Sequence, residues 1–533
     1  MLFAKPHRWA LAGILLAALA LRVWGIGFGL PGASARPDET SVAGPAVMFL
    51  TESLRPQDFL YPTGFMYALS GAYAAYYQVT KPWASYKTIR EFSESRRTNI
   101  APFLLISRAI SVLMGVCTVG WLFLLGARAA DRRTGLVAAA FLALAFLPVR
   151  DSHFGVTDTT MTAFVVWGVF QIVKWHESGT PGRALIAGVT GGLAMSTKYN
   201  GLGLAVPFGV AAVDRLISAI RMRRPTSPVM ISGVLFVVAF AAMFLAGTFY
   251  LLIEPDRFLA DVSAQAAILE GGHGMVQTRG WLHHAIVTLP LGLGWPIFFA
   301  GIAGMIWFSA RDARRAMVLF AFPVAYYLVA GNGHTVFARY MLPVLPFLCF
   351  GAAYAAVQFV DLAAAETTQP RRRAALVALA VLLVLPTATK SIQIDRLLSR
   401  ADNRLVVADA IGTIVPAGAS IYQSGESFGR VQLPASLALR HAGFDPAAGK
   451  FDSGMAPDWI LIQRSPLAIY SAVPPQISKL LADEYTLVKS FPAADERPRV
   501  YDQQDAFFLP LSGFAGIERP GPSFELYHRK GML

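Results

Sequence analysis

The chain has 533 residues, of which 55% are hydrophobic and only 15% are charged, against about 25% charged in ordinary soluble domains. This composition excludes a soluble globular protein and predicts a membrane protein spanned by helices, because the apolar runs are long and do not alternate with polar residues. The net charge of +13 comes from short basic clusters between these runs, the positive-inside pattern, which argues against a nucleic-acid partner.

The first apolar run, residues 9–29, follows the basic residues Lys5 and Arg8. A cleavable signal peptide is one interpretation of this start. The run is longer than the apolar core of about 7–15 residues found in signal peptides, and many apolar runs follow it. We therefore predict a retained first span with its N-terminus in the cytoplasm.

Ten further apolar runs predict spanning helices, at residues 101–126, 136–149, 159–175, 184–197, 201–214, 228–253, 283–309, 316–331, 338–360 and 374–389. If the run at 59–79 also spanned, every later basic cluster would move outside. We therefore predict that 59–79 is re-entrant or interfacial within a first outer loop, residues 30–100, which leaves about eleven spans.

Two of these predicted spans, 184–197 and 201–214, are short and separated by a polar interruption at 198–201. Broken helices at membrane depth are typical of segments that line a polar cavity. This interruption therefore marks a candidate site.

From about residue 391 onward charge and proline become more frequent, and apolar runs shorten, as at 459–462. Short strand-like runs alternate with helix-like stretches such as 476–484. The predicted fold is thus an all-α polytopic membrane domain, residues 1–390, followed by a small α/β domain, residues 391–533. By the same charge pattern, this second domain lies outside the cytoplasm.

Ionisable residues gather in the loops that are predicted to face outward. Asp38 and Glu39 follow the first span, and Asp151, His153 and Asp158 lie in a later loop. Ionisable residues at membrane edges are costly, so they are candidates for function. Structural interpretations stay open: acidic residues favour helix N-termini, and cations near span ends snorkel to the interface.

Two further alternatives concern the later acidic loop. Asp151 is adjacent to Arg150 in the sequence and is a natural ion-pair partner for it. The cofactor that the sequence suggests is a divalent cation, which Asp38, His153 and Asp158, together with Asp151, could bind. Loop spacing alone does not define ligand geometry, so the use of a metal stays open.

The outer face offers no nucleotide pool, and the sequence contains no G-x-x-x-x-G-K-[ST] phosphate loop. An activated donor would have to arrive through the membrane, which favours a lipid-linked phosphate. Such a donor needs cations and hydroxyls near its phosphate, and the candidates are Arg108, Lys198, Arg279, Arg339, Tyr61 and Tyr340. One carboxylate must accept the proton of an acceptor hydroxyl, and Asp38 is the best candidate.

Six segments in order resemble a known family: RPDET (36–40), YPTGFMYALS (61–70), SRAISVLMGV (107–116), DSHFGVTDTTMTAF (151–164), GLAMSTKYNGL (192–202) and FARYMLPVLP (337–346). They are similar to the GT-C membrane glycosyltransferases of family 39, which include protein O-mannosyltransferases and aminoarabinose transferases. The resemblance extends over nearly the whole chain. The YPTG segment lacks the lysine and second proline of the aminoarabinose transferases, which argues against lipid A as acceptor.

The resemblance implies a polyprenyl-phosphate-sugar donor and transfer on the periplasmic face of the inner membrane, usually with inversion. By motif, Asp38 would be the catalytic base with Glu39 as its neighbour, and Asp151 or Asp158 would be the second acidic position. The donor phosphate would meet Arg108, Lys198 and Arg339. The acceptor would be a protein, a lipid or a glycan.

Two other classes of function remain as alternatives: a transporter or flippase of lipid-linked sugars, and a non-catalytic membrane scaffold. A transporter is expected to show ionisable pairs near the bilayer midplane and internal repeats. Here the acids cluster at span ends on one face, and no repeat is evident. The sequence therefore favours an enzyme with lipid partners and no nucleic-acid partner.

Overall fold

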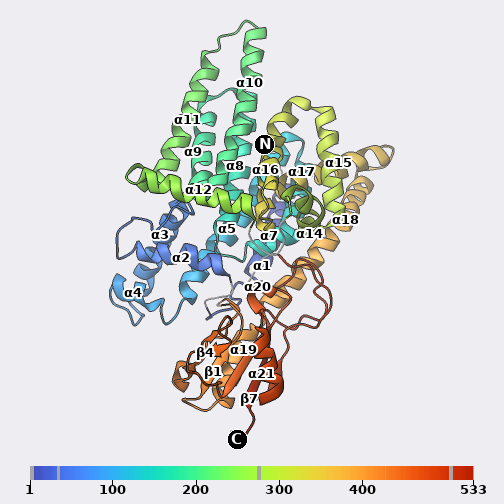
Figure 1. Cartoon of the computed structure of the whole chain (residues 1–533). Coiled ribbons are helices and arrows are strands. Elements are labelled where there is room, and N and C mark those ends of the chain that lie inside the picture. Colours follow the sequence, from blue (N-terminus) through green and yellow to red (C-terminus); the bar gives the residue numbers. More distant parts are fainter. Residues whose placement is uncertain (1–4, 33–35, 273–277, 427, 503–507, 532–533) are drawn as a thin grey trace. The chain divides into compact units, whose positions relative to one another are not determined.

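The computed structural model describes residues 5–32, 36–272, 278–426, 428–502 and 508–531 (Figure 1). The chain divides into two compact units. The first contains Met1–Val23, Ser41–Arg96 and Phe103–Ile392, and the second contains Trp24–Thr40, Arg97–Pro102 and Gln393–Leu533. The described part of the first unit is helical, and both sheets lie in the second.

The helices of the first half of the chain are α1 (Lys5–Val23), α2 (Pro37–Met48), α3 (Gly64–Thr80), α4 (Ile89–Ser95), α5 (Ala101–Ala129), α6 (Arg132–Leu144), α7 (Phe146–Asp151), α8 (Thr157–Ser178), α9 (Pro181–Thr197), the 3-10 helix η1 (Tyr199–Leu204), α10 (Ala205–Arg221) and α11 (Ser227–Gly247). After η2 (Phe249–Leu252) come α12 (Pro255–Gly271), α13 (Gly280–His283), η3 (His284–Thr288), α14 (Leu289–Leu293), α15 (Trp295–Arg311), α16 (Ala313–Asn332), η4 (Ala338–Val344), α17 (Leu345–Ala363) and α18 (Gln369–Leu398). Helices α9 and α11 run side by side (Figure 1). All eleven runs predicted to span lie largely in these helices.

Among the described residues, six stretches of helix are long and apolar enough to cross a membrane: Ala101–Ala129, Tyr199–Arg221, Ser227–Gly247, Ala313–Asn332, Ala338–Ala363 and Gln369–Ile414. A seventh is possible if Gly280–Leu293 and Trp295–Arg311 form one span. This count is lower than eleven because several predicted spans form shorter helices, such as α6 with 13 residues and α9 with 17 residues.

The run at 283–309 departs from the prediction of one continuous span. Helices α14 and α15 meet at a bend of 112° around Gly294, which has the positive φ of 81° that favours glycine. Pro296 follows and lacks a backbone N–H, so the hydrogen-bond ladder of α14 cannot continue through this point. Averaged hydropathy does not reveal this break, because all residues around it are apolar.

Helices α15 and α17 pack through small residues. A Cβ atom on Gly304 would collide with the carbonyl oxygen of Gly351, and one on Gly351 would collide with the carbonyl oxygen of Gly301. Such close backbone approach through glycine is common between membrane helices. The α15–α17 contact therefore depends on the absence of side chains at these positions.

Gly304→Ala is expected to lower the free energy of unfolding by about 1–3 kcal/mol, since the added methyl group overpacks this contact. Thermal unfolding in detergent micelles measures the effect. The matched control is Gly209→Ala in α10, where the new Cβ would meet no atom within 4 Å. Equal melting temperatures for the two variants would contradict the packing argument.

The second unit contains a five-stranded sheet in the order β2-β1-β5-β7-β6. Its strands are β1 (Ser420–Gln423), β2 (Arg440–His441), β5 (Trp459–Arg464), β6 (Tyr485–Phe491) and β7 (Ser523–Arg529). Strands β2, β1 and β5 are parallel, and β7 is antiparallel to β5 and β6. The hairpin β3 (Phe444–Asp445) and β4 (Lys450–Phe451) forms a separate two-stranded sheet.

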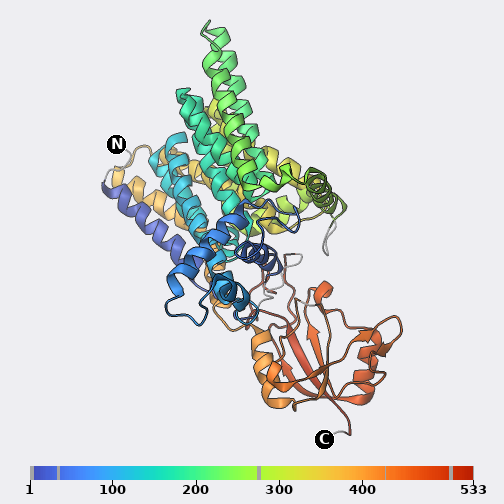
Figure 2. The ribbon, with the colours of Figure 1, turned by 90° about the vertical axis from the view of Figure 1, so that its left-hand side faces the viewer.

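Helices cover both faces of this sheet (Figure 2). On one face Trp459 and Leu461 of β5 pack with Val407 and Ile411 of α19 (Asn403–Ile414). On the other face the alternate residues of β5, Ile460 and Ile462, pack with Ile477 and Leu481 of α21 (Pro475–Glu484). Successive side chains of β5 point to opposite faces of the sheet, and both faces are buried, so this strand forms the centre of three layers. The sequence predicted a small α/β domain in this part of the chain.

Candidate functional site

The polar interruption predicted at 198–201 is present in the structure. Helix α9 ends at Thr197, and Lys198 takes an extended conformation with φ −155° and ψ 133°. The chain continues as η1, where a Cβ on Gly201 would collide with the main chain of Ala194 and Met195. Glycine therefore allows the turn to pack tightly against the end of α9, and Lys198 is left at the break.

Lys198 forms an ion pair with Asp158, with 2.6 Å between Nζ and Oδ1. Asp158 lies in the first turn of α8 and is only 3% exposed. An acid at a helix N-terminus and a lysine at a helix C-terminus are each stabilised by the helix dipole. The Lys198 ammonium also lies over the Tyr340 ring, 5.2 Å from its centroid.

A cavity of about 260 Å³ opens beside this pair. It is lined by four of the six residues predicted to contact a donor phosphate, namely Lys198, Arg339, Tyr340 and Tyr61. The rest of the lining is mainly apolar with a few polar groups, and comes from Leu60, Pro62, Tyr199, Asn200, Val262, Gln265, Ala266, Ile268, Leu269, Val329 and Ala330.

Arg339 enters the cavity from η4 and is 8% exposed. Its guanidinium lies 4.2 Å from the ring centroid of Phe337 and 5.8 Å from that of Tyr340. Stacking on aromatic faces stabilises a guanidinium and restricts its orientation. Two cations, from the end of α9 and from η4, therefore reach one enclosed space.

The loop that carries Tyr61 is held by contacts with the region around α12. Glu254 accepts hydrogen bonds from Arg55, at 2.5 Å, and from Arg257, at 3.0 Å. The Phe59 N–H donates to Asp261 at 2.9 Å, and the Tyr199 hydroxyl donates to the Phe59 carbonyl at 2.8 Å. Tyr61 is therefore positioned by its neighbours in the chain.

The remaining first-unit candidates lie outside this cavity lining. Asp151 is fully buried and pairs with Arg150 at 3.2 Å, and His153 bonds through Nδ1 to the Val149 carbonyl at 2.9 Å. Arg108 is fully buried on α5. Arg279 donates to Asn332 at 3.4 Å.

Asp38 and Glu39 occupy the first turn of α2. Glu39 is fully buried, and its backbone N–H donates to the backbone carbonyl of Arg36 at 3.1 Å. Both residues belong to the segment Trp24–Thr40 of the second unit. The grouping around Lys198 consists of first-unit residues and does not include them.

The described ranges contain no group of three His, Cys, Asp or Glu side chains that could hold a metal ion. Of the residues suggested for a divalent cation, Asp158 pairs with Lys198 and His153 bonds to the Val149 carbonyl. Asp38 lies in the second unit.

The first comparison with known proteins is a match of residues 105–246 to the family Dolichyl-phosphate-mannose-protein mannosyltransferase. Among solved structures, ArnT from Cupriavidus metallidurans in the apo state is similar, with a TM-score of 0.52 and 14% identity over 97% of each chain. The chain has the GT-C fold of membrane glycosyltransferases.

A second GT-C neighbour is the archaeal oligosaccharyltransferase AglB from Archaeoglobus fulgidus, in complex with an inhibitory peptide and a dolichol-phosphate. Its TM-score is 0.53 at 14% identity, over 80% of this chain and 63% of that chain. The chain thus spans less than two thirds of the length of AglB. No curated protein matches the sequence.

The family match runs from α5 into α11. It includes both members of the Asp158–Lys198 pair, as well as Arg108 and Asp151. Arg339 and Tyr340 lie outside it and enter the site through η4.

Sequence reasoning missed part of the cavity wall in this GT-C fold. Asn200 donates to the Tyr326 hydroxyl at 3.3 Å. Its place in the sequence, within the predicted interruption at 198–201, could have identified it as a cavity residue. Gln265 and Leu269 come from α12. The sequence around a glutamine or leucine in a helix does not distinguish a residue that lines a site from any other helical residue.

Glu254→Gln is expected to loosen the loop that carries Tyr61. The hydrogen bond from Arg55, with help from Arg257, lowers the pKa of Glu254 below its ordinary value of 4.5. Because the folded-state pKa is lowered, this contribution is present above pH 4.5 and is lost as the pH falls through the lowered pKa. Hydrogen exchange at residues 57–62 is expected to be several-fold faster in the variant at neutral pH.

The matched control is Glu270→Gln, an exposed carboxylate at the end of α12. It is expected to leave exchange at residues 57–62 unchanged. Equal protection in wild type and Glu254→Gln would show that the two arginines do not hold the loop.

Proposed function

We propose that this chain is a glycosyltransferase that moves a sugar from a polyprenyl-phosphate donor to an acceptor on the outer face of the inner membrane. The observation that carries the proposal is the meeting of Lys198, Arg339, Tyr340 and Tyr61 in one cavity. The sequence predicts each of these four residues as a contact of a donor phosphate. The presence of a dolichol-phosphate in the AglB structure supports the same donor class.

The chemistry of the cavity suits a lipid-linked phosphate. A guanidinium binds phosphate oxygens with two parallel hydrogen bonds, and an ammonium acts as a compact point charge. Tyr61 and Tyr340 add hydroxyl groups, while Val262, Leu269 and Val329 supply apolar surface for the first part of a prenyl chain. Asp158, as the second acidic position, orients Lys198.

The reaction is a single displacement at the anomeric carbon. Asp38, with Glu39 as its neighbour, accepts the proton of the acceptor hydroxyl. The acceptor oxygen attacks from the side opposite the phosphate, the bond between the anomeric carbon and the phosphate oxygen breaks, and configuration is inverted. Lys198 and Arg339 stabilise the negative charge that develops on the departing polyprenyl phosphate.

The orientation follows from the basic clusters. Two ion pairs tie predicted cytoplasmic ends together, Arg128 with Glu177 and Arg314 with Asp214 at 2.8 Å. Cations are retained on the cytoplasmic side. In this orientation the N-terminus is cytoplasmic, and residues 391–533 form a domain in the periplasm or outside the cell.

Purified full-length protein in liposomes that contain radiolabelled polyprenyl-phosphate sugars tests the proposal. The expected result is release of free polyprenyl phosphate, together with an equal transfer of radiolabelled sugar to an added protein, lipid or glycan acceptor. Movement of the donor between leaflets without any release would instead identify a transporter or flippase. Donor binding with neither release nor movement would identify a non-catalytic scaffold.

A further inference from the structure

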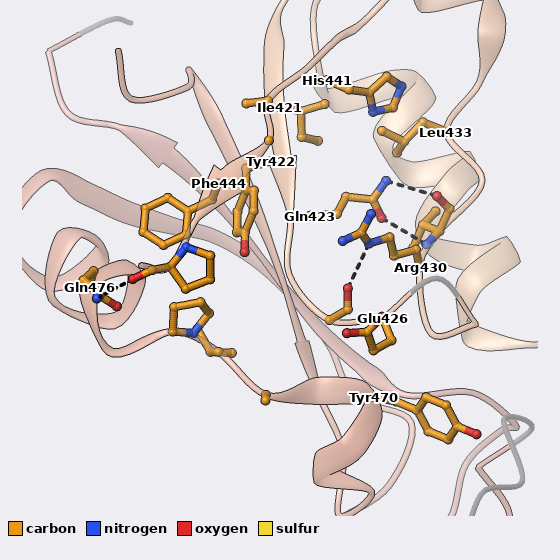
Figure 3. Close-up of a pocket in the computed structure, with 18 of the residues that line it drawn as sticks. Ile421, Tyr422, Gln423, Glu426, Arg430, Leu433, His441, Phe444, Tyr470 and Gln476 are labelled. Carbon is orange, nitrogen blue, oxygen red and sulfur yellow. Dashed lines mark hydrogen bonds between the residues drawn. The ribbon is translucent and has the colours of Figure 1, made fainter. Parts of the chain in front are cut away.

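The second unit has a cavity of its own, of about 980 Å³. It lies at the carboxyl end of β1, and Figure 3 shows residues of β1, the β1–β2 loop and the β3 region around it. Strand β1 has parallel neighbours on both sides, β2 and β5. Such a position, where successive parallel strands lie on opposite sides of a central strand, is where open α/β sheets bind ligands.

The loop after β1 is held in one shape by two amide side chains, one half-buried and one fully buried. Gln423 donates to the Val431 carbonyl at 3.1 Å and accepts from the Val431 N–H at 3.0 Å. Gln463, fully buried on β5, donates to the Tyr470 carbonyl at 3.0 Å, which also accepts from the Glu426 N–H at 2.9 Å. The cavity is therefore formed in advance of any ligand, which lowers the entropic cost of binding.

One side of the cavity is aromatic. Figure 3 shows Tyr422 and Phe444 together on this side, with ring centroids 6.2 Å apart in an edge-on arrangement. Phe444 is supported from behind by Phe451, at 5.0 Å, and is itself half-buried. A fixed aromatic face of this kind packs against flat apolar surfaces of a ligand.

The opposite side is polar. Arg430 donates through Nε to the Gly425 carbonyl at 2.9 Å, which fixes its guanidinium at the cavity (Figure 3). Within the described ranges, no residue forms a hydrogen bond or ion pair with its Nη atoms, with the Glu426 carboxylate or with the His441 ring. Each of these groups lines the cavity, so both donors and acceptors are available to a ligand.

This combination selects a class of ligand. The single guanidinium is balanced by the Glu426 carboxylate, which disfavours a polyanion such as a nucleoside diphosphate. The charged wall disfavours an acyl or prenyl chain. The volume is at the upper end of the roughly 300–1,000 Å³ typical of small-molecule sites. Carbohydrates present hydroxyls that both donate and accept, together with C–H faces that pack on aromatic rings.

We propose that the cavity formed by Tyr422, Glu426, Arg430, His441 and Phe444 binds an oligosaccharide. Its lining shares no residue with the cavity beside Lys198 that we propose as the donor cavity. Phe444 packs against a sugar ring, while Arg430 and Glu426 hydrogen-bond its hydroxyls.

Binding of defined oligosaccharides to the full-length protein in detergent tests this inference. The probes are di- to tetrasaccharides of glucose, mannose, galactose, N-acetylglucosamine and glucuronic acid, measured by saturation-transfer NMR and calorimetry without donor. At least one probe is expected to bind. Arg430→Ala and Phe444→Ala are each expected to weaken it at least tenfold, and Glu426→Gln, which keeps the shape, to weaken it several-fold.

The matched control is Lys479→Ala, which removes an exposed positive charge on α21 outside the cavity and is expected to leave affinity unchanged. Absence of binding by every probe, equal binding in Arg430→Ala and Lys479→Ala, or selective binding of short peptides in place of sugars would each overturn the inference. Because no donor is present, these outcomes are independent of whether the protein transfers sugar.

Discussion

Asp38→Asn is expected to reduce sugar transfer by roughly 10²–10⁴-fold, the usual contribution of a general base. Asparagine has nearly the same shape as aspartate but cannot accept the proton of the acceptor hydroxyl. Asp38 lies in the first turn of α2 and has an intermediate exposure, so the substitution is expected to leave membrane insertion and folding intact. Release of polyprenyl phosphate in liposomes measures the loss.

Two controls separate chemistry from structure in this experiment. The thermal unfolding curve of Asp38→Asn is expected to match that of wild type. Asp256→Asn makes the same chemical change at an exposed position in the first turn of α12 and is expected to retain full activity. Full activity in Asp38→Asn would assign the base to another residue.

Separating the Asp158–Lys198 pair is expected to have the largest effect on stability. The two side chains are 5% and 13% exposed, so removal of one leaves the other charge buried without its partner. Breaking a buried pair costs about 3–5 kcal/mol. Lys198→Met and Asp158→Asn are therefore each expected to lower the free energy of unfolding in detergent by about 3–5 kcal/mol.

The double variant Lys198→Met/Asp158→Asn decides what the pair does. With neither charge present, no buried charge lacks its partner, so much of the stability is expected to return. Donor release is expected to stay low, because the cavity has lost a cation that stabilises the departing phosphate. Recovery of both stability and activity would show that the pair is only structural.

Much of the candidate site could be predicted because its chemistry is unusual for a membrane chain. Lys198 interrupts two apolar runs, and Arg339 lies at the start of another, so their cost in a membrane makes them candidates for function. The structure brings them together with Tyr61 and Tyr340. The choice between Asp151 and Asp158 could not be made from the sequence, since it depends on which cation each one meets in space. Asp151 meets Arg150, and Asp158 meets Lys198.

For the fold, too, local features could be predicted from the sequence, whereas features that depend on distant segments could not. Strand β5 and helix α21 could be predicted from local apolar runs, and the order of strands around β1 could not, because it depends on pairing between distant segments. The cavity at the carboxyl end of β1 therefore could not be predicted from the sequence, although Tyr422 could be named there as an aromatic residue able to stack on a sugar. Likewise, α12 contributes Gln265 and Leu269 to the cavity beside Lys198, and only tertiary packing gives them that position.

The composition of the donor cavity also bears on how the protein is made. Its walls come from residues 60–62, 198–200, 262–269 and 329–340, so they enter the membrane at widely separated times during synthesis. Lys198 and Asp158 are in place early, whereas Arg339 and Tyr340 arrive only after α16. If the cavity binds the donor as proposed, a nascent chain would lack one of its two phosphate-binding cations until η4 has been synthesised, so an incomplete chain would not bind the donor as the full protein does.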